Sequence, residues 1–388
     1  MVSEPGMIIV GSGPAGVAAA ESFREYNTEI PVRILSADID LPYARPPLSK
    51  EYLRGQTDDL DDLALHPARW FDDHAIELIL DVAVDRLDLT ERAVYAGDRR
   101  HPFDILILAC GSAPVPPPVP GGGRALLLRS LANAAVLRDA AETANYAVVI
   151  GSGFIGCEAA ASLALRDVAV TLVAPETLPQ ESRLGAEAAG RLRDLVAETG
   201  VRHVGGVNVE EITDAGVRLD DGVTIDCDLV LAATGVAPQS HIAAEGGLQI
   251  GGSRIVVGSD MRTSAPAVFA AGGVALARHQ VAGRHLAIEH WQDATDQGAI
   301  AGAGAAGQHS RWTGVPGFWT SIGEATVKYH AWGDGYERSR MLDHPDGFTV
   351  WYESGDAVVG VLTYNADDDY DLGERLIAER RPAPVPMQ

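Results

Sequence analysis

Two copies of one glycine pattern constrain this chain more than any other feature. GSGPAG occupies residues 11–16, and GSGFIGCE occupies residues 151–158, which is 140 positions later. Each copy follows a short apolar run (7–10 and 147–150) and precedes an alanine-rich stretch typical of a helix. This strand, turn and helix context is the one in which GxGxxG binds a dinucleotide. We therefore predict two dinucleotide sites in one chain.

The glycines of such a fingerprint have separate tasks. The first permits a tight turn, the second lets a pyrophosphate approach the main chain, and the third lets the helix pack closely on the strand. The helix N-terminus then offers N–H groups and the positive end of the helix dipole to the phosphates. In order, these glycines are Gly11, Gly13 and Gly16 in the first copy and Gly151, Gly153 and Gly156 in the second.

Composition restricts the class of protein. A chain of 388 residues is expected to form two or three domains. It contains no apolar run of membrane-spanning length, and the start MVSEPG does not resemble a signal peptide, so we expect a cytoplasmic protein without a membrane partner. The net charge of −24 argues against nucleic acid as a partner. Cys110, Cys157 and Cys227 are far apart, which disfavours a disulfide framework, a redox dithiol and a metal site.

Three further stretches carry candidate binding residues. After the apolar run 32–35, Asp38 is placed to bind ribose hydroxyls, with an ordinary loop aspartate as the alternative. Residues 41–53, LPYARPPLSKEYL, combine two prolines with Arg45 and Lys50, two cations downstream of a phosphate site.

The third stretch should determine whether the chain binds NADH or NADPH. The expected strand 168–173 is followed by Ala174, Pro175 and Glu176, where an acid selects NADH and an arginine NADPH. Without an arginine directly there, NADH is favoured. Glu176 is a candidate substitute acid, and Arg183 argues for NADPH.

Residues 41–53 resemble the YxRPPLSK motif of the FAD-dependent ferredoxin and rubredoxin reductases, the group that includes putidaredoxin reductase, the biphenyl dioxygenase reductase component and apoptosis-inducing factor. Further matching segments follow in the family's order and cover nearly the whole chain. They are ILACGSAP (107–114), LRSLANAAVLR (128–138), LAATGVAPQS (231–240), VFAAGGVA (268–275), EHWQDATDQGAIAG (289–302) and GFWTSIG (317–323).

The resemblance implies an α/β fold with two Rossmann-like domains, as in glutathione reductase, and a small C-terminal α+β domain. The FAD-binding domain would comprise residues 1–110 and 240–310, the NAD(H)-binding domain 111–239, and the C-terminal domain 311–388. The alternating runs 326–332 and 348–352 independently predict strands in the last of these.

The implied activity is transfer of hydride from NADH, with NADPH as an alternative, to FAD, which then reduces a small iron-sulfur ferredoxin or a rubredoxin of an oxygenase system. Lys50 would lie beside the flavin and pair with Glu158, so both residues are assigned to catalysis. The alternative for Lys50 is an ordinary surface lysine. The alternative for Glu158 is an acid at a helix N-terminus, which the helix dipole favours. A monomer or homodimer is expected. Docking an acidic ferredoxin would require a basic patch, for which Arg278, Arg284 and Arg311 are the candidates.

The resemblance also implies a set of cofactor contacts. Within this set, His290 is given no catalytic role. For Trp291 and Trp319 the alternative to a place near the flavin is an ordinary position in the hydrophobic core. For FAD the contacts are Gly11, Gly13, Pro14, Ala15, Gly16, Asp38, Arg45, Lys50, Val84, Arg129, Gly272, Gly273, Glu289, His290, Trp291 and Trp319. For the nicotinamide dinucleotide they are Gly151, Gly153, Ile155, Gly156, Glu158, Glu176 and Gly235.

The chain departs from the family at three places. Gly273 replaces an aspartate whose carboxylate binds the ribityl chain of the flavin, so restoring aspartate is expected to tighten FAD binding. Ala174 replaces the ribose-binding acid of the second fingerprint. Thr320 and Ser321 stand where an acid often follows the FWS motif, which casts doubt on the surface that docks the partner.

Two other functions stay open, and the missing acids motivate the second of them. One is an NADH oxidase or diaphorase without a protein acceptor. The other is a flavin redox-sensing binding protein of low turnover, like apoptosis-inducing factor, in which the bound nucleotide changes conformation or oligomeric state.

Overall fold

The computed structural model describes residues 4–57 and 60–384. Contacts within the chain divide it into two compact units. The first unit comprises Met1–Ala44, Leu60–Ala113 and Ala237–Pro316, and the second comprises Arg45–Asp59, Pro114–Val236 and Gly317–Gln388. The three-domain division drawn from the sequence stays a prediction.

The first unit is built on a parallel sheet with the strand order β20-β7-β1-β2-β3. Its strands are β1 (Met7–Val10), β2 (Val32–Leu35), β3 (Ile76–Ile79), β7 (Ile105–Leu108) and β20 (Val268–Ala270). In the central strand β1, Ile9 lies opposite Ile34 of β2 and Ile107 of β7, and every residue is buried. A parallel strand covered on both faces needs a continuous apolar run, and residues 7–10 supply it.

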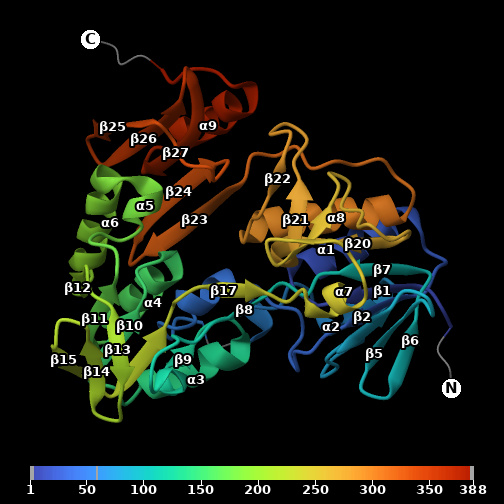
Figure 1. The fold of residues 1–388 in the computed structure, drawn as a ribbon, viewed down its shortest axis with the longest axis horizontal. Helices are drawn as coiled ribbons and strands as arrows, with labels where there is room; N and C mark the ends of the chain where they lie inside the picture. Colours follow the sequence, from blue (N-terminus) through green and yellow to red (C-terminus); the bar gives the residue numbers. More distant parts are fainter. Residues whose placement is uncertain (1–3, 58–59, 385–388) are drawn as a thin grey trace. The chain divides into compact units, whose positions relative to one another are not determined.

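Two helices of the first unit, α1 (Pro14–Tyr26) and α8 (Trp291–Ala305), pack against each other (Figure 1). Glycines of α8 make the close approach possible. A Cβ on Gly298 would lie 2.2 Å from the carbonyl oxygen of Ala15, and one on Gly302 would lie 2.1 Å from that of Ala19. The start of α1, which carries the first fingerprint, is therefore held by the backbone of α8.

The second unit contains another parallel sheet, with the order β12-β11-β10-β16-β9. Its strands are β9 (Leu126–Leu127), β10 (Tyr146–Ile150), β11 (Ala169–Ala174), β12 (Arg202–Gly205) and β16 (Leu229–Ala232), and its helices include α3 (Leu131–Ala141), α4 (Phe154–Ala164) and α6 (Ala186–Glu198). Helix α4 contacts β10, β11 and also β23 of the C-terminal sheet. This explains why its residues from Gly156 to Leu163 are all buried.

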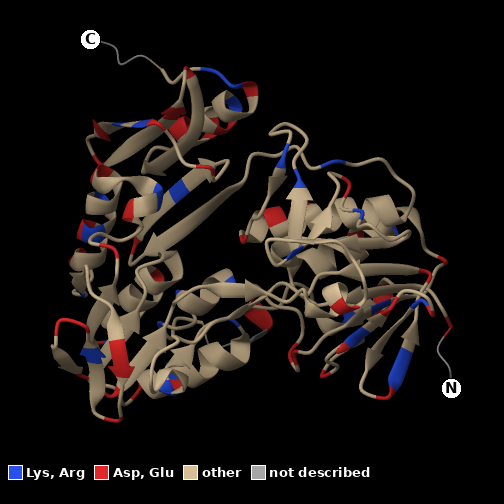
Figure 2. Cartoon of the chain, viewed as in Figure 1, with Lys and Arg blue, Asp and Glu red and all other residues tan. Residues whose placement is uncertain are grey.

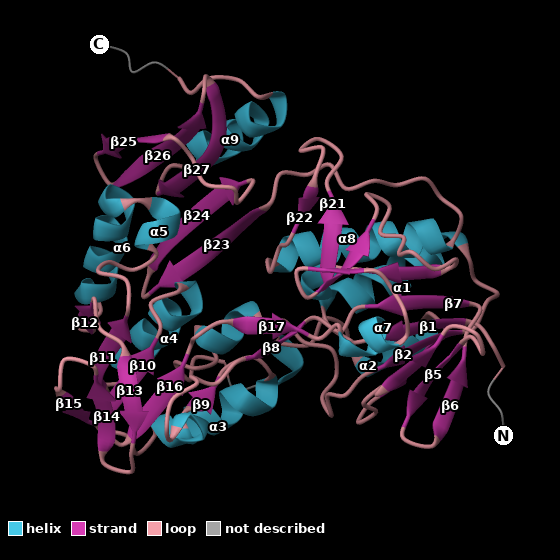
Figure 3. Ribbon diagram, viewed as in Figure 1, coloured by secondary structure: helices cyan, strands magenta, loops and turns pink. Residues whose placement is uncertain are grey.

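The C-terminal sheet is antiparallel, in the order β23-β24-β27-β26-β25 (Figure 3). Its elements are β23 (Gly317–Ile322), β24 (Ala325–Ala331), β25 (Arg338–His344), β26 (Gly347–Ser354), β27 (Ala357–Tyr364) and the helix α9 (Asp367–Glu379). One hydrophobic core joins this sheet to α4, with Leu163, Ile322 and Val350 among its members. The expected C-terminal strands and the predicted fold class are confirmed.

The remaining elements form smaller sheets and short helices. The smaller sheets contain β4 (Arg86–Asp88), β5 (Ala93–Ala96) and β6 (Arg99–Pro102); β13 (Val209–Ile212), β14 (Gly216–Leu219) and β15 (Thr224–Asp226); β18 (Ile250–Gly251), β19 (Arg254–Val257), β21 (Ala275–Arg278) and β22 (His285–Leu286); and β8 (Ser112–Pro114) with β17 (Val236–Pro238). The short helices are α2 (Ala68–Asp73), α5 (Glu181–Leu184) and α7 (His241–Glu245), with 3-10 turns η1 (Pro46–Ser49), η2 (Leu60–Asp62), η3 (Gly122–Arg124) and η4 (Gly272–Val274). Among the described residues, no helix is both long and apolar enough to cross a membrane.

Candidate functional site

The two glycine fingerprints share one backbone geometry, each in its own unit. Gly11 follows β1 with φ +107°, and Gly151 follows β10 with φ +105°. A Cβ on Gly16 would lie 2.0 Å from the carbonyl oxygen of Gly11, and one on Gly156 would lie 1.9 Å from that of Gly151. The positive φ at Gly11 and Gly151 favours glycine. The short distances at Gly16 and Gly156 leave no room for a side chain. The tight turn and the close helix packing are therefore present in both copies.

Both turns also fit a pyrophosphate group. Gly13 and Gly153 are the N-caps of α1 and α4. Glycine has no side chain to cap a helix, so the N–H groups of the first turn can serve an anionic ligand. At Gly153 the nearest described atom to an added Cβ is Nε2 of Gln180, at 3.7 Å, so a ligand has room beside the backbone. Pro14 begins α1, where its missing N–H costs nothing.

Asp38 is joined to the first fingerprint by a chain of hydrogen bonds. The hydroxyl oxygens of Ser12 and Ser36 are 2.6 Å apart, and Ser36 Oγ accepts the N–H of Asp38 at 3.2 Å. The hydroxyl of Tyr43 donates to Oδ2 of Asp38 at 2.6 Å. These contacts fix a carboxylate just after β2, the position from which an acid binds the ribose of a dinucleotide.

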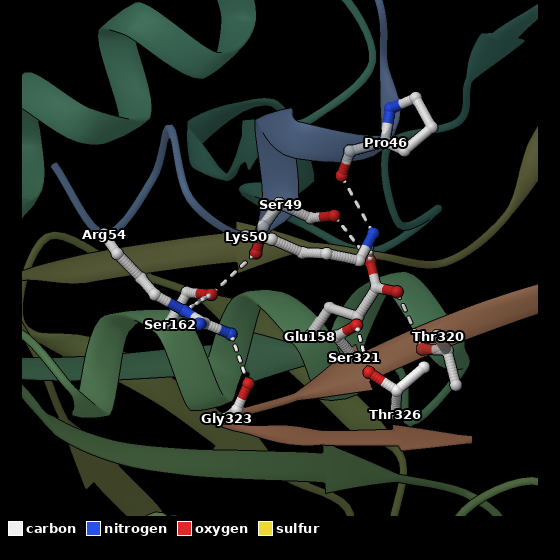
Figure 4. Close-up of polar contacts among 10 residues, drawn as sticks. All are labelled: Pro46, Ser49, Lys50, Arg54, Glu158, Ser162, Thr320, Ser321, Gly323 and Thr326. Carbon is white, nitrogen blue, oxygen red and sulfur yellow. Dashed lines mark hydrogen bonds and ion pairs between the residues drawn. The ribbon is translucent and has the colours of Figure 1, made fainter. Parts of the chain in front are cut away.

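Lys50 and Glu158 form a buried ion pair within the second unit (Figure 4). Nζ of Lys50 lies 3.0 Å from Oε2 of Glu158, and the side chains are 7% and 3% exposed. Nζ also donates to the carbonyl oxygen of Pro46 at 2.8 Å, across the turn η1. The predicted pairing of these two side chains is present, and their role toward a flavin stays a prediction.

Two hydroxyl groups that the sequence did not single out complete the shell of Glu158. Ser49 Oγ donates to Oε2 at 2.5 Å, and Thr320 Oγ1 donates to Oε1 at 2.7 Å. With Lys50, these donors compensate the cost of burying a carboxylate. The partners lie 109 and 162 positions from Glu158, which explains why spacing could not reveal them. Ser49 at least carried a signal, because it belongs to the RPPLSK segment.

Thr320 changes the interpretation of the altered FWS motif. The residue is 1% exposed, so its side chain is not part of a docking surface. Thr320 stands at the serine of the FWS motif, and its hydroxyl donates to Glu158. The position at which an acid would follow is Ser321, whose Oγ lies 3.1 Å from Oγ1 of Thr326. Trp319, which precedes Thr320 in β23, is 46% exposed, as expected from alternation along a strand. The doubt about the surface that docks the partner therefore concerns Ser321, and it stays untested.

Arg54 ties the segment carrying Lys50 to two other parts of the second unit (Figure 4). Its Nε donates to Ser162 Oγ of α4 at 3.3 Å, and a terminal nitrogen donates to the carbonyl oxygen of Gly323 at 2.9 Å. Ser162 in turn donates to the carbonyl oxygen of Ser49 at 2.7 Å. These contacts hold the backbone at Lys50 against α4 and the turn between β23 and β24.

The altered FAD segment lies at η4, where Gly273 approaches Glu289. A Cβ on Gly273 would lie 2.6 Å from Oε2 of Glu289. Ser112 Oγ donates to Oε1 of the same carboxylate at 2.6 Å, and Arg254 donates to it at 2.9 Å. The expectation that aspartate at position 273 tightens FAD binding stays a prediction, and the structure adds a condition to it. That aspartate would have to displace a held side chain and would place two carboxylates side by side.

The neighbouring residues of the FAD segments are placed around the start of α8. Gly272 has φ +76°, and its N–H donates to Oε1 of the buried Gln297 at 3.0 Å. His290 is the N-cap of α8, with Nδ1 3.1 Å from Oδ2 of Asp293. Trp291 begins the helix and is half-buried.

Glu176 and Arg183, the two residues proposed to determine whether NADH or NADPH binds, lie beyond the end of β11. Ala174, the last residue of that strand, is buried. Glu176 Oε1 accepts the backbone N–H of Ser182 at 3.0 Å. The guanidinium of Arg183 lies 6.0 Å from the ring centroid of Phe154, the first residue of α4. An acid and an arginine are thus both in the neighbourhood of the second fingerprint.

The other predicted contacts are distributed between the units. Ala15 packs against Gly272, where an added Cβ would lie 3.2 Å from that of Ala15. Val84 is half-buried between β3 and β4, in the first unit. In the second unit, Arg45 precedes η1, Arg129 precedes α3, Ile155 is exposed on α4, and Gly235 has φ +106° just before β17.

The cysteines are unsuited to redox chemistry. Burial raises the pKa of Cys110 to about 12 and that of Cys227 to about 11, and it raises the pKa of Cys157 further still. Thiols with such pKa values stay protonated near neutral pH and are poor nucleophiles. In the part of the chain that the structure describes, no cluster of three or more His, Cys, Asp or Glu side chains could hold a metal ion.

Known proteins resemble the chain over its whole length. Residues 6–298 match the pyridine nucleotide-disulphide oxidoreductase family. Putidaredoxin reductase CamA of Pseudomonas putida is 31% identical over 98% of this chain and 94% of its own, and rhodocoxin reductase of Rhodococcus erythropolis is 30% identical over 97% and 90%.

Solved structures agree with this result. A ferredoxin reductase from Rhodopseudomonas palustris superposes with a TM-score of 0.92 at 29% identity, covering 97% of this chain and 95% of its own. The reductase in a covalent putidaredoxin reductase-putidaredoxin complex gives a TM-score of 0.92 at 30% identity, covering 98% and 94%. The predicted family is confirmed: the chain belongs to the pyridine nucleotide-disulphide oxidoreductases, and within them it is of the ferredoxin reductase type.

Proposed function

We propose that this protein is an FAD-dependent NADH reductase that passes electrons to a small iron-sulfur ferredoxin, or to a rubredoxin, of an oxygenase system. The observation that carries the proposal is the repeated turn, in which Gly11 and Gly151 share one φ and Gly16 and Gly156 approach the preceding carbonyl equally closely. Two such turns fit two dinucleotides. Full-length similarity to putidaredoxin and rhodocoxin reductases supports the class of acceptor.

In the first unit, the chain would hold FAD through the start of α1 and through Asp38. The N–H groups of α1 would bind the pyrophosphate, and the carboxylate of Asp38, oriented by Tyr43, would bind the ribose. FAD, when bound, supplies hydride acceptance and one-electron donation, which the amino-acid side chains cannot provide.

In the second unit, Lys50 would provide a fixed positive charge for the reaction. Glu158 orients Nζ, while Ser49 and Thr320 hold Glu158 in place. A cation fixed before the reaction begins needs no reorganisation when negative charge develops on the flavin, and this kind of preorganisation is a large term in catalysis.

The N-terminus of α4 would bind the pyrophosphate of the nicotinamide cofactor. We favour NADH because the turn directly after β11 contains Glu176 and no arginine. Arg183, which lies near the first residue of α4, is the argument for NADPH. The two cofactors should therefore be compared directly.

The test is an absorption spectrum of the purified protein, followed by anaerobic titration with NADH and, separately, NADPH. The proposal predicts bound FAD that NADH bleaches rapidly and that oxidised ferredoxin or rubredoxin recolours. A colourless preparation that takes up no FAD would contradict it.

The same experiment separates the two other functions. Rapid bleaching with oxygen consumption, but no reaction with either protein acceptor, would indicate an NADH oxidase or diaphorase. The high thiol pKa values already speak against the thiol-dependent forms of such enzymes. Slow bleaching together with a change of oligomeric state on size-exclusion chromatography would indicate a redox-sensing binding protein.

A further inference from the structure

We propose that Glu289 replaces the carboxylate that Gly273 lacks, and that it binds a hydroxyl of the ribityl chain of FAD. The inference rests on the FAD site of the proposed function. It concerns a carboxylate that residue 289 would supply in place of residue 273, which lies 16 positions earlier in the sequence and in the same unit.

The carboxyl group of Glu289 occupies the space in which a side chain at position 273 would begin. A Cβ on Gly273 would lie 2.6 Å from Oε2 of Glu289, 3.0 Å from Cδ and 3.0 Å from Oε1. No other residue supplies any of the three nearest atoms. Glycine at 273 is therefore the residue that makes room for Glu289, and the two positions are coupled.

Neighbouring side chains hold this carboxylate in place. Oε1 accepts hydrogen bonds from Ser112 Oγ at 2.6 Å and from Arg254 at 2.9 Å. Arg254 also donates to the carbonyl oxygen of Gly273. One guanidinium thus connects the backbone of Gly273 with the side chain of Glu289, which orients Oε2 toward Gly273.

The site remains open enough for a ligand. The side chain of Glu289 is 26% exposed, so its carboxylate is not enclosed by the protein. A backbone alternative at Gly272 is less suitable, because its N–H already donates to Gln297. A carboxylate that accepts a hydroxyl forms a charge-assisted hydrogen bond, which is stronger than one between neutral groups.

The test measures the dissociation constant of FAD. The FAD-loaded protein is diluted, and the fluorescence of the FAD that dissociates is recorded at each protein concentration. For Glu289→Gln we expect a dissociation constant at least about ten-fold higher, equivalent to about 1.4 kcal/mol. Gly273→Asp alone should also weaken binding, because two carboxylates would compete for one place. The double variant Glu289→Ala/Gly273→Asp should recover most of the affinity that Glu289→Ala loses.

The control is Glu77→Gln, which removes the same charge from an ion pair with Arg33 in the same unit and should leave the dissociation constant unchanged. Melting temperatures of the FAD-free proteins separate binding from a purely structural role. A structural role alone would lower the melting temperature of Glu289→Ala without recovery of FAD affinity in the double variant.

Two results would overturn the inference while leaving the proposed function intact: a parent-like dissociation constant for Glu289→Gln, or a double variant no better than Glu289→Ala. If the parent protein itself fails to bind FAD, both the proposed function and this inference fall.

Discussion

Lys50 is one of only two lysines in the sequence, and its charge is compensated inside the protein. Burying an ion pair costs desolvation energy that its own attraction often fails to recover, so such a pair is weak evidence for a role in stability. Here the pair is supported by Pro46, Ser49 and Thr320. Whether the pair serves the reaction or only the structure is decided by replacing Lys50.

Replacement of this lysine gives the first prediction. Lys50→Ala should slow single-turnover reduction of the flavin by NADH at least about ten-fold, or about 1.4 kcal/mol of activation free energy, because the fixed cation is lost. It should also lower the free energy of unfolding by about 3–5 kcal/mol, since Glu158 is left buried without its charge partner. Stopped-flow absorbance and urea denaturation measure the two effects.

The matched control is Lys328→Ala, at the other lysine. Its Nζ pairs with Asp367 at 2.8 Å, and the Lys328 and Asp367 side chains are 32% and 71% exposed, against 7% and 3% for Lys50 and Glu158. An exposed pair contributes less than about 1 kcal/mol, so both stability and reduction rate should stay near those of the parent. An unchanged reduction rate in Lys50→Ala would show that the buried pair is only structural.

The fingerprints act as whole elements, because each joins a strand, a turn and the start of a helix. Gly156→Ala would push α4 away from β10, since the added Cβ would lie 1.9 Å from the carbonyl oxygen of Gly151. We expect weaker NADH binding with normal FAD content. Gly16→Ala, with a corresponding distance of 2.0 Å, should instead reduce FAD content.

Equilibrium titration with NADH and the ratio of flavin to protein absorbance measure these two outcomes. Gly190→Ala in α6 is the control, because nothing within 4 Å meets its Cβ. It should raise the free energy of unfolding by about 0.5–1 kcal/mol, as expected for alanine in a helix. If both fingerprint variants affect the same nucleotide, the assignment of one dinucleotide to each element is incorrect.

The turn between β21 and β22 predicts a dependence of stability on pH. His279 is buried there, with Nδ1 accepting the N–H of Ala282 at 3.0 Å and Nε2 lying 2.8 Å from the carbonyl oxygen of Gly314. This geometry requires a neutral ring, and burial lowers the pKa of His279 below its ordinary value. Below about pH 6.5 the unfolded state therefore binds more protons, and the free energy of unfolding falls as pH decreases.

Urea denaturation at pH 7.5 and pH 5.5 checks this dependence. His279→Gln should lose less stability between the two pH values than the parent, because the titrating ring is gone. The exposed His309 provides the control, and His309→Gln should retain the dependence of the parent. An equal loss of stability in His279→Gln and the parent would assign the effect to other groups.

The sequence predicted elements better than it predicted contacts between them. Residues 7–10 and 147–150 could be predicted as strands, because a buried parallel strand is uniformly apolar and a glycine turn follows each run directly. The contacts of Thr320 and Glu289 could not be predicted in the same way. Thr320 entered the sequence analysis only as part of an altered motif, and Glu289 only as an FAD contact implied by the resemblance. In the structure Thr320 donates to Glu158, and the carboxyl group of Glu289 fills the space beside Gly273. Such relationships depend on folding, which brings distant residues together.

At the scale of the whole molecule, the net charge of −24 opposes the approach of an acidic partner. Figure 2 shows acidic residues throughout the chain and basic residues at the ends of β21 and β22. Arg278 ends β21 and pairs in register with His285, which Arg284 precedes. The N–H of Gln280 donates to the carbonyl oxygen of Trp312, which brings Arg311 near the same hairpin. The three arginines proposed as a basic patch are therefore neighbours in the first unit.

Charge reversal in this patch gives the last prediction. In Arg278→Glu/Arg311→Glu, kcat/KM with an acidic ferredoxin should fall at least about ten-fold at low salt, because electrostatic steering sets the rate of association. Reduction of ferricyanide, a small acceptor that needs no protein docking, should be unchanged.

Raising the ionic strength should slow the parent more than the variant, since salt screens an attraction that the variant lacks. Arg99→Glu/Arg100→Glu, at two exposed positions of β6, makes the same change of net charge away from the patch and provides the control. A variant that reduces ferredoxin with the efficiency and salt dependence of the parent would place the acceptor on another surface of the molecule.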